Sequence, residues 1–290
     1  MRIGLPTRYA RTTVLIAATL AVPFAALADA TAPYYERSFV LAADAKCRLF
    51  TPALTNALSA STWQARGAAA RAGVSDVSLA QTVERAKANA AGTQCADPQL
   101  AVVQTRVATA FSGWSRVARM TFRSGRSSWV ANRSDFSSPT WRLMQTTQIG
   151  ATPVTFGYVE GGAERQNLKA VVSFAGRSRP YSARIVMRNA ERAPHPFLGS
   201  NGVAMMPAEA SRQAFFAAGN LPADRALLQE GKTQGEAWLF PAETADALAK
   251  LDPREPFAVE FLFGDGSVAR ATLEAGDFAA GRAFIAMGSL

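Results

Sequence analysis

Arginine and aromatic residues alternate between Phe111 and Arg142, and Asp135 is the only acid in this segment. A guanidinium fork pairs with two oxygens of a phosphate or carboxylate, and a flat ring stacks on a sugar, a base or an acyl boundary. The segment therefore predicts a surface that binds an anion. The alternative is that the rings belong to the core and the arginines to the solvated face beside them. The candidate ligand-binding residues are Arg116, Arg119, Arg123, Arg126, Arg133, Arg142, Trp129 and Trp141.

His195 is the only histidine, and it lies between two prolines. It is the weak catalytic candidate, because a Ser-His or Cys-His mechanism would have to use it; the alternative is an ordinary loop histidine. The chain has no G-x-S-x-G, H-E-x-x-H or G-x-G-x-x-G motif. Acids such as Glu160 have no identifiable partner for carboxylate catalysis. The sequence thus leans away from an enzyme and predicts no cofactor.

Residues 1–28 have the organisation of a secretory signal peptide. Arginines at 2, 8 and 11 form a positive start, an apolar stretch follows, and Ala26-Leu27-Ala28 resembles a cleavage site. The apolar stretch is shorter than the roughly 20 residues that span a bilayer, and no later stretch is long enough. We expect a bacterial protein that is periplasmic or secreted, with no transmembrane segment after cleavage.

The two cysteines, Cys47 and Cys95, are expected to form a disulfide, because an exported protein meets an oxidising compartment. Two separate buried thiols are the alternative. Two sulfurs and one distant histidine cannot complete a zinc shell, so no metal site is predicted.

Charge is distributed unevenly along the chain. Residues 37–192 carry 21 Lys and Arg against 8 Asp and Glu, and residues 193–290 carry 7 against 12. An anionic envelope polymer, a lipid headgroup or an acidic protein is therefore a plausible partner. Nucleic acid is disfavoured because export removes the protein from it.

Three helices are expected in the region 38–122, after an N-terminal arm over 29–37. Thr51-Pro52, Ser75 and Asp97-Pro98 provide the start signals, and glycines at 73 and 92 provide two stop signals. An apolar stripe from Leu100 to Ala118 predicts that the third helix packs on the rest of the molecule. The Cys47–Cys95 bond would tie this helical unit together.

Residues 123–290 predict an antiparallel, strand-rich region. Strands are expected at 141–147, 154–159, 168–175 and 181–189, with Arg184 and Arg188 facing outward, followed by a helix over 207–218. A short strand at 238–240, a helix after Pro241 and a hairpin turning at Asp265-Gly266 complete the chain. The predicted fold class is α+β, with a disulfide-stapled N-terminal helical unit docked on an antiparallel-sheet-rich region crossed by one or two helices.

Three hypotheses for function follow. The first is a non-catalytic protein of the bacterial cell envelope that binds an anionic ligand or partner through its basic part. The second is a hydrolase acting on an envelope polymer, and the third is a structural assembly subunit. Salt dependence of binding separates the first from the third, because contacts to a polyanion weaken steeply as salt rises.

Overall fold

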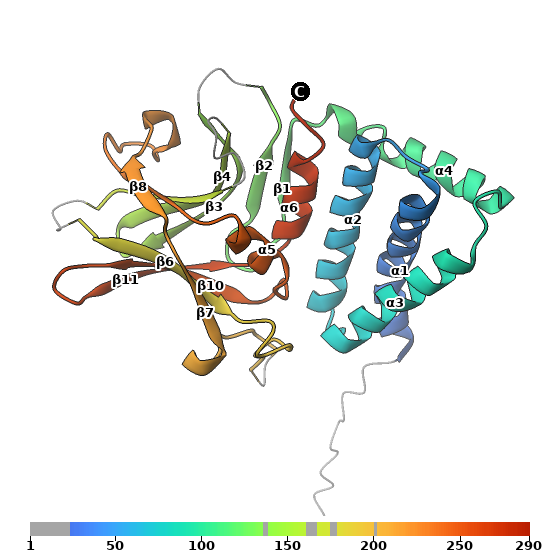
Figure 1. Cartoon of the computed structure of the whole chain (residues 1–290), viewed down its shortest axis with the longest axis horizontal. Helices are drawn as coiled ribbons and strands as arrows, with labels where there is room; N and C mark the ends of the chain where they lie inside the picture. Colours follow the sequence, from blue (N-terminus) through green and yellow to red (C-terminus); the bar gives the residue numbers. More distant parts are fainter. Residues whose placement is uncertain (1–23, 136–138, 161–166, 175–178, 200–201) are drawn as a thin grey trace, which may run out of the picture.

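The structure is a computed structural model, and it describes residues 24–135, 139–160, 167–174, 179–199 and 202–290. Over these residues it contains six α-helices and two antiparallel sheets, so the α+β class is confirmed. Helices from the first third of the chain form one side of the molecule, and the sheets form the other (Figure 1). The predicted signal peptide lies outside the described residues as far as residue 23, and its expected cleavage site falls at the start of the first helix.

Four helices make up the N-terminal unit: α1 Phe24–Cys47, α2 Pro52–Arg71, α3 Asp76–Gly92 and α4 Pro98–Phe111. The expected start signals operate. Pro52 and Pro98 each occupy a first-turn position, and the Ser75 hydroxyl accepts a hydrogen bond from the backbone N–H of Ser78 (3.1 Å). The Cys47–Cys95 disulfide is present and joins the end of α1 to the loop before α4.

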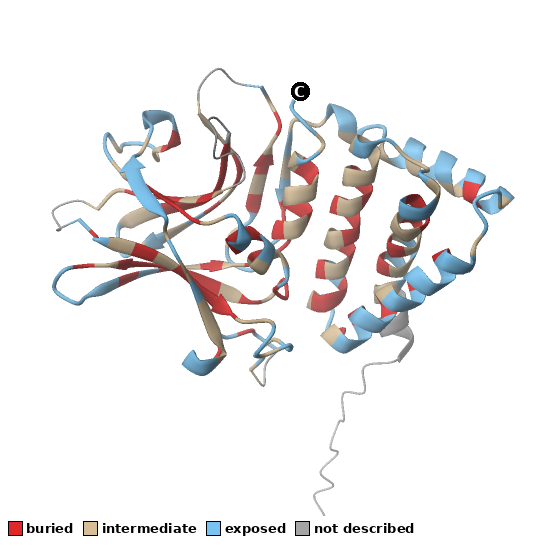
Figure 2. Ribbon diagram, in the orientation of Figure 1, coloured by how far each residue is buried: buried red, intermediate tan, exposed pale blue. Residues whose placement is uncertain are grey.

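Two expectations for this unit are wrong. Residues 29–37 are not an arm: they belong to α1, which contains Pro33, and Tyr34 is buried against α2 and α3. The predicted third helix ends at Phe111, earlier than its apolar stripe. A 3-10 turn, η1 Trp114–Arg116, and a strand follow, and Leu100 is the one buried residue of α4. Figure 2 shows α4 as a largely exposed helix.

The first sheet has the strand order β1-β2-β3-β4-β5-β9-β8. The expected strands of this sheet are confirmed within a few residues, while β1, β2 and β8 had no sequence prediction. Their bounds are β1 Arg119–Phe122, β2 Trp129–Asn132, β3 Thr140–Ile149, β4 Thr152–Glu160, β5 Leu168–Val172, β8 Gly219–Pro222 and β9 Glu236–Leu239.

The second sheet has the order β11-β10-β6-β7, with bounds β6 Ser182–Arg188, β7 Arg212–Phe216, β10 Pro256–Leu262 and β11 Val268–Glu274. The hairpin between β10 and β11 is confirmed, and Gly266 has the positive φ (81°) that its turn requires. The helix predicted over 207–218 is wrong: a short 3-10 turn, η2 Glu209–Ser211, leads into β7. A further 3-10 turn, η3 Arg225–Leu227, follows β8.

Strands β7 and β8 are separated by two alanines and belong to different sheets, so the chain crosses from one sheet to the other there. Between the sheets lies one core of aromatic and aliphatic side chains, which includes the fully buried Trp129, Phe156 and Phe257. Arg188, expected to face outward, is instead buried with Glu255, to which its Nε and Nη2 donate at 2.6 and 2.8 Å. A buried charge is stable only with such a partner.

Two helices near the C-terminus complete the fold: α5 Glu243–Ala249, as expected after Pro241, and α6 Phe278–Ile285. α6 lies between the sheets and α2 (Figure 1). Gly67 of α2 allows the two helices to approach, because a Cβ there would lie 2.0 Å from Asp277 Oδ1. Asp277 is buried, and its carboxylate accepts hydrogen bonds from Nη1 and Nη2 of Arg71 in α2 (3.0 and 3.1 Å). This ion pair joins the helical unit to the rest of the molecule.

Candidate functional site

The arginine and tryptophan residues predicted to form one surface are dispersed by the fold. Trp129 is fully buried and its Nε1 donates to the carbonyl oxygen of Ala275 (2.9 Å), so it cannot stack on a ligand. Trp141 is half-buried and donates to the carbonyl oxygen of Leu227 (3.2 Å). Both rings therefore belong to the packing of the sheets, as the alternative interpretation had it.

The six arginines divide into two groups by exposure. Four have exposed side chains on η1, β1 and the loop after it: Arg116, Arg119, Arg123 and Arg126. Of these, the exposed Arg126 forms an ion pair with the half-buried Glu274, with Nε 3.7 Å from Oε1. The other two, Arg133 and Arg142, are buried (4% and 8% exposed), and both line one cavity.

This cavity has a volume of about 410 Å3 and lies between one end of the first sheet and the helices α5 and α6. Strands β2 to β4 supply the wall on the sheet side, and the C-terminal residues Gly288 and Ser289 supply part of the rim. The volume falls in the range of roughly 300–1,000 Å3 that small-molecule sites occupy. Its ionisable side chains are Arg133, Arg142, Tyr158, Asp246 and Arg282.

Arg133 is held in place by backbone carbonyl oxygens. Its Nε donates to Gly288 (2.7 Å) and its Nη1 to Trp114 (3.1 Å) and Val117 (3.3 Å). Burial lowers the pKa of Arg133, and among the described residues no carboxylate forms an ion pair with it. Carbonyl dipoles stabilise the guanidinium but leave its net charge in place. A full positive charge therefore remains at the cavity wall.

Arg142 lies beside it and donates to the carbonyl oxygens of Asn132 (3.3 Å) and Ser134 and to the hydroxyl of Ser289 (3.2 Å). Burial lowers the pKa of Arg142, and the charge of Asp135 partly opposes this effect. Backbone hydrogen bonds hold Leu290 next to this pair of arginines. The Leu290 N–H donates to the Arg133 carbonyl oxygen (2.8 Å), and the Asp135 N–H donates to the Leu290 carbonyl oxygen (2.9 Å). The fold thus brings two guanidinium groups to the wall of the cavity.

Three further ionisable groups line the cavity: Tyr158 of β4, Asp246 of α5 and Arg282 of α6. Arg282 of α6 donates to Asp246 Oδ1 (2.9 Å) and to the Ala245 carbonyl (3.2 Å) of α5. Burial raises the pKa of Tyr158 to about 12, while the positive charge of Arg282 and a hydrogen bond from it act in the other direction. The phenol therefore keeps its proton at neutral pH and can donate it to a ligand.

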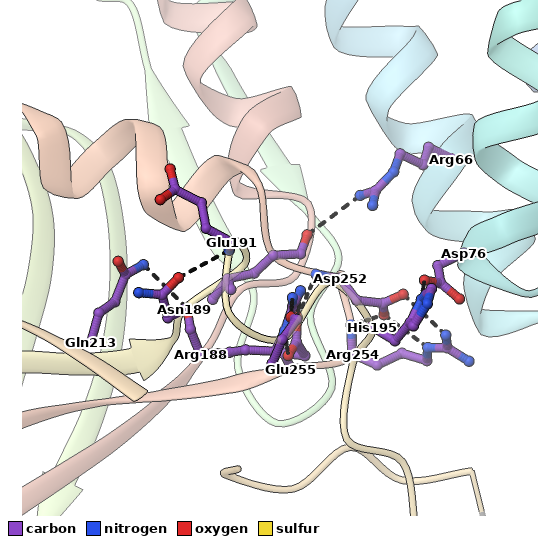
Figure 3. Close-up of polar contacts among 12 residues, drawn as sticks. Arg66, Asp76, Arg188, Asn189, Glu191, His195, Gln213, Asp252, Arg254 and Glu255 are labelled. Carbon is purple, nitrogen blue, oxygen red and sulfur yellow. Dashed lines mark hydrogen bonds and ion pairs between the residues drawn. The ribbon is translucent and has the colours of Figure 1, made fainter. Parts of the chain in front are cut away.

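His195 lies outside the cavity, at the junction of the helical unit and the sheets. Its Nδ1 is hydrogen bonded to Asp76 in the first turn of α3, and its side chain is 64% exposed (Figure 3). Close to His195, Arg254 forms an ion pair with the buried Asp252, with Nε 2.8 Å from Oδ1 (Figure 3). Among the described residues, no serine or cysteine hydrogen bonds to His195. The contact therefore joins two parts of the fold.

No group of three or more His, Cys, Asp or Glu residues that could hold a metal ion occurs in the part of the chain that the structure describes. The same residues contain no helix that is both long and apolar enough to span a bilayer. Glu160, the weak carboxylate candidate, ends β4, and its side chain lies outside the described residues.

Comparisons of the chain with protein-family models, curated proteins and solved structures find no match. The residues themselves must therefore indicate the function.

Of the five ionisable residues that line the cavity, the sequence predicts Arg133 and Arg142 as ligand-binding residues and does not indicate Tyr158, Asp246 or Arg282. Tyr158 lies in a correctly predicted strand, and its role depends on helices that are more than 80 residues away in the chain. Arg282 lies in α6, for which no helix was predicted. The available sequence signal was Arg282 itself, a single charged residue within the apolar segment 278–285.

Proposed function

We propose that this protein is an exported protein of the bacterial cell envelope that binds a small anionic ligand and catalyses no reaction on it. The observation that carries this proposal is the convergence of Arg133, Arg142 and Arg282 on one cavity; among the described residues that line it, Asp246 is the only acidic side chain. The buried guanidinium of Arg133, whose described hydrogen-bond acceptors are backbone carbonyl oxygens, favours an anion at this wall of the cavity. The signal-like N-terminus and the disulfide support an address outside the cytosol.

The volume of the cavity also limits the size of the ligand. The exposed arginines of β1 and η1 could attract a polyanion, but the cavity is of a size for a small molecule. A ligand that binds there exchanges its hydration shell for guanidinium contacts. Its binding should therefore depend less on salt than the binding of a polymer across an exposed surface.

The test uses isothermal titration calorimetry of the full mature protein with hexanoate and with inorganic phosphate. We expect at least one of the two to bind, and we expect Arg133→Gln to weaken that binding at least tenfold. Arg126→Gln is the matched control, since Arg126 is exposed and lies outside the cavity. Circular dichroism and thermal melting establish that each variant folds.

A second variant keeps the test valid if Arg133→Gln fails to fold. Ala242 is exposed at the start of α5 and lines the cavity, so Ala242→Trp should obstruct it while leaving all three guanidinium groups in place. Ala108→Trp on the exposed face of α4 is its control. The proposal is wrong if neither anion binds, or if both bind Ala242→Trp as tightly as the wild type.

A further inference from the structure

A second cavity lies on the outer face of the second sheet, away from the core. Ile185 of β6 and Phe261 of β10 belong to the core between the sheets, so their neighbours Arg184 and Glu260 point to the other face. The cavity has a volume of about 380 Å3, and its described lining comes from the four strands of this sheet and from η2. It is separate from the cavity at α5 and α6, since the two share no described lining residue.

The strand register fixes the order of residues around this second cavity. Val186 of β6 lies opposite Ala214 of β7, and these two apolar residues form the floor. Two residues along β6 from Val186, Arg184 lies in one cross-strand row with Glu260 and Arg270. One side of the floor is therefore bounded by two arginines that flank a buried carboxylate.

Arg212 bounds the floor on the opposite side. It precedes Ala214 by two residues in β7, whereas Arg184 pairs with Phe216, two residues after Ala214. A strand rises about 3.3 Å per residue, so the backbones of Arg184 and Arg212 are about 13 Å apart along the strands. Both side chains line the same cavity, so a ligand above the floor meets guanidinium groups on two sides.

The three arginines retain hydrogen-bond donors that the fold does not use. Arg184 donates through Nε to Glu260 (2.7 Å), and Arg212 donates through Nε to the Pro207 carbonyl oxygen (2.6 Å). Arg270 contacts Glu260 through Nε (2.8 Å) and Nη2 (2.6 Å). Within the described residues, the terminal nitrogens of Arg184 and Arg212 make no hydrogen bond. These N–H groups are available to a ligand.

Positive charge exceeds negative charge in the described lining. The three guanidinium groups face two carboxylates, Glu209 and Glu260. Glu260 is buried between Arg184 and Arg270, so it offsets one of their two charges. Glu209 is exposed, so solvent screens its repulsion of an anion. The side chains of Arg184 and Arg270 are themselves 36% and 57% exposed, so the attraction for an anion should weaken as salt rises.

We propose that this cavity is a second anion site and that it takes a tetrahedral oxyanion, the sulfate or phosphate group. Such a group presents oxygens in several directions, so it can accept hydrogen bonds from Arg212 on one side and from Arg184 and Arg270 on the other. A carboxylate presents only two oxygens in one plane and would be bound from one side. This site shares no described lining residue with the cavity of the proposed function, so either proposal can fail alone.

Isothermal titration calorimetry with inorganic sulfate tests this site in the Ala242→Trp variant, in which the first cavity is obstructed. We expect sulfate to bind. Adding Arg212→Gln to this variant should weaken binding at least tenfold, the loss of one charge-assisted hydrogen bond. Acetate, the carboxylate probe, should bind more weakly than sulfate. Glycerol 3-phosphate and inorganic phosphate distinguish the two sources of the group: tighter binding of the ester indicates a group carried on an organic molecule, and equal binding indicates the free ion.

A second substitution keeps the test decisive if Arg212→Gln fails to fold. Ala214 is exposed, so Ala214→Glu places a carboxylate on the floor of the cavity without removing a guanidinium group, and sulfate binding should disappear. Ala108→Glu on the exposed face of α4 changes the net charge equally and should leave binding intact. Circular dichroism establishes that each variant folds.

The outcomes separate the two sites. Absence of sulfate binding to Ala242→Trp, or equal binding after Ala214→Glu and after Ala108→Glu, overturns the second site. Acetate that binds as tightly as sulfate overturns its assignment to a tetrahedral oxyanion. Hexanoate, which tests the first cavity, should lose affinity in Ala242→Trp and keep it in Ala214→Glu. Loss of hexanoate binding in Ala214→Glu as well would contradict the independence of the two sites.

Discussion

Single charged residues in this fold owe their state to burial combined with a specific partner, and Glu260 is the clearest case. It pairs directly across the strands with Arg184 of β6 and Arg270 of β11, which donate to its carboxylate at 2.7 and 2.8 Å. Burial acts to raise the pKa of Glu260, but the hydrogen bonds from the two arginines outweigh it, and the pKa is lowered.

The sign of the pH dependence follows from that lowered pKa. A carboxyl group whose pKa is lower in the folded protein contributes stability above its ordinary value of 4.5, and this contribution disappears as the pH falls through the folded value. We therefore expect Glu260→Gln to lower the free energy of unfolding by about 2 kcal/mol at pH 7. The difference from wild type should shrink below pH 4.5.

Urea denaturation at pH 7, 5 and 3 measures this difference. Glu243→Gln is the control, because Glu243 is exposed at the start of α5. A constant gap between Glu260→Gln and wild type over the whole range would contradict the predicted role of the two arginines.

At the scale of elements, the contact between α2 and α6 depends on one missing side chain. Gly67 lies in the interior of α2, where glycine ordinarily costs about 1 kcal/mol relative to alanine. An added methyl group would displace the carboxylate of Asp277, which is buried and bonded to Arg71. Burial raises the pKa of Asp277, while Arg71 acts to lower it, so this arginine is the partner that compensates the buried charge.

We expect Gly67→Ala to destabilise the protein by about 2 kcal/mol, because displacement of Asp277 outweighs the gain in helix propensity. Gly92→Ala is the matched substitution: Gly92 also lies in a helix, and a Cβ there would meet nothing within 4 Å. That variant should be neutral or slightly more stable. Chemical denaturation of the two variants side by side provides the comparison, and equal effects would show that the α2–α6 approach does not constrain position 67.

The same elements show what sequence patterns can and cannot reveal. Alternation and start signals located α2, α3, β3 to β6 and the β10–β11 hairpin, because these depend on residues close together in the chain. The segment 207–218, which includes β7, was predicted as a helix because it is rich in alanine and carries little alternation. Pairing of β7 with β6 fixes residues 212–216 as a strand. Arg188 was assigned to solvent because its ion-pair partner, Glu255, is 67 residues away.

For the molecule as a whole, the candidate site arises from segments that meet only after the complete chain has folded. Arg133 follows β2, Asp246 lies in α5 and Arg282 in α6, so no local pattern places them together. The helical unit contacts the site through α2. Asn56 Nδ2 of α2 donates to the carbonyl oxygen of Ala286 (2.8 Å), and Ala286 lines the cavity. Loosening the helical unit should therefore weaken the site as well as the fold.

The Cys47–Cys95 disulfide offers a way to loosen that unit without touching the cavity. It joins two residues 48 positions apart and ties α1 to the loop before α4, whose helix has only one buried residue. The entropy of the closed loop predicts a loss of about 4 kcal/mol in the free energy of unfolding when the bond is removed.

We expect the double variant Cys47→Ala/Cys95→Ala to show this loss in guanidinium denaturation. In this variant, α4 should exchange its amide hydrogens before α2, because α4 has only one buried residue to hold it in place. Hydrogen exchange measured by mass spectrometry separates α4 from α2. Uniform exchange across both helices, or an unchanged denaturation midpoint, would mean that packing of the helices alone holds the unit together.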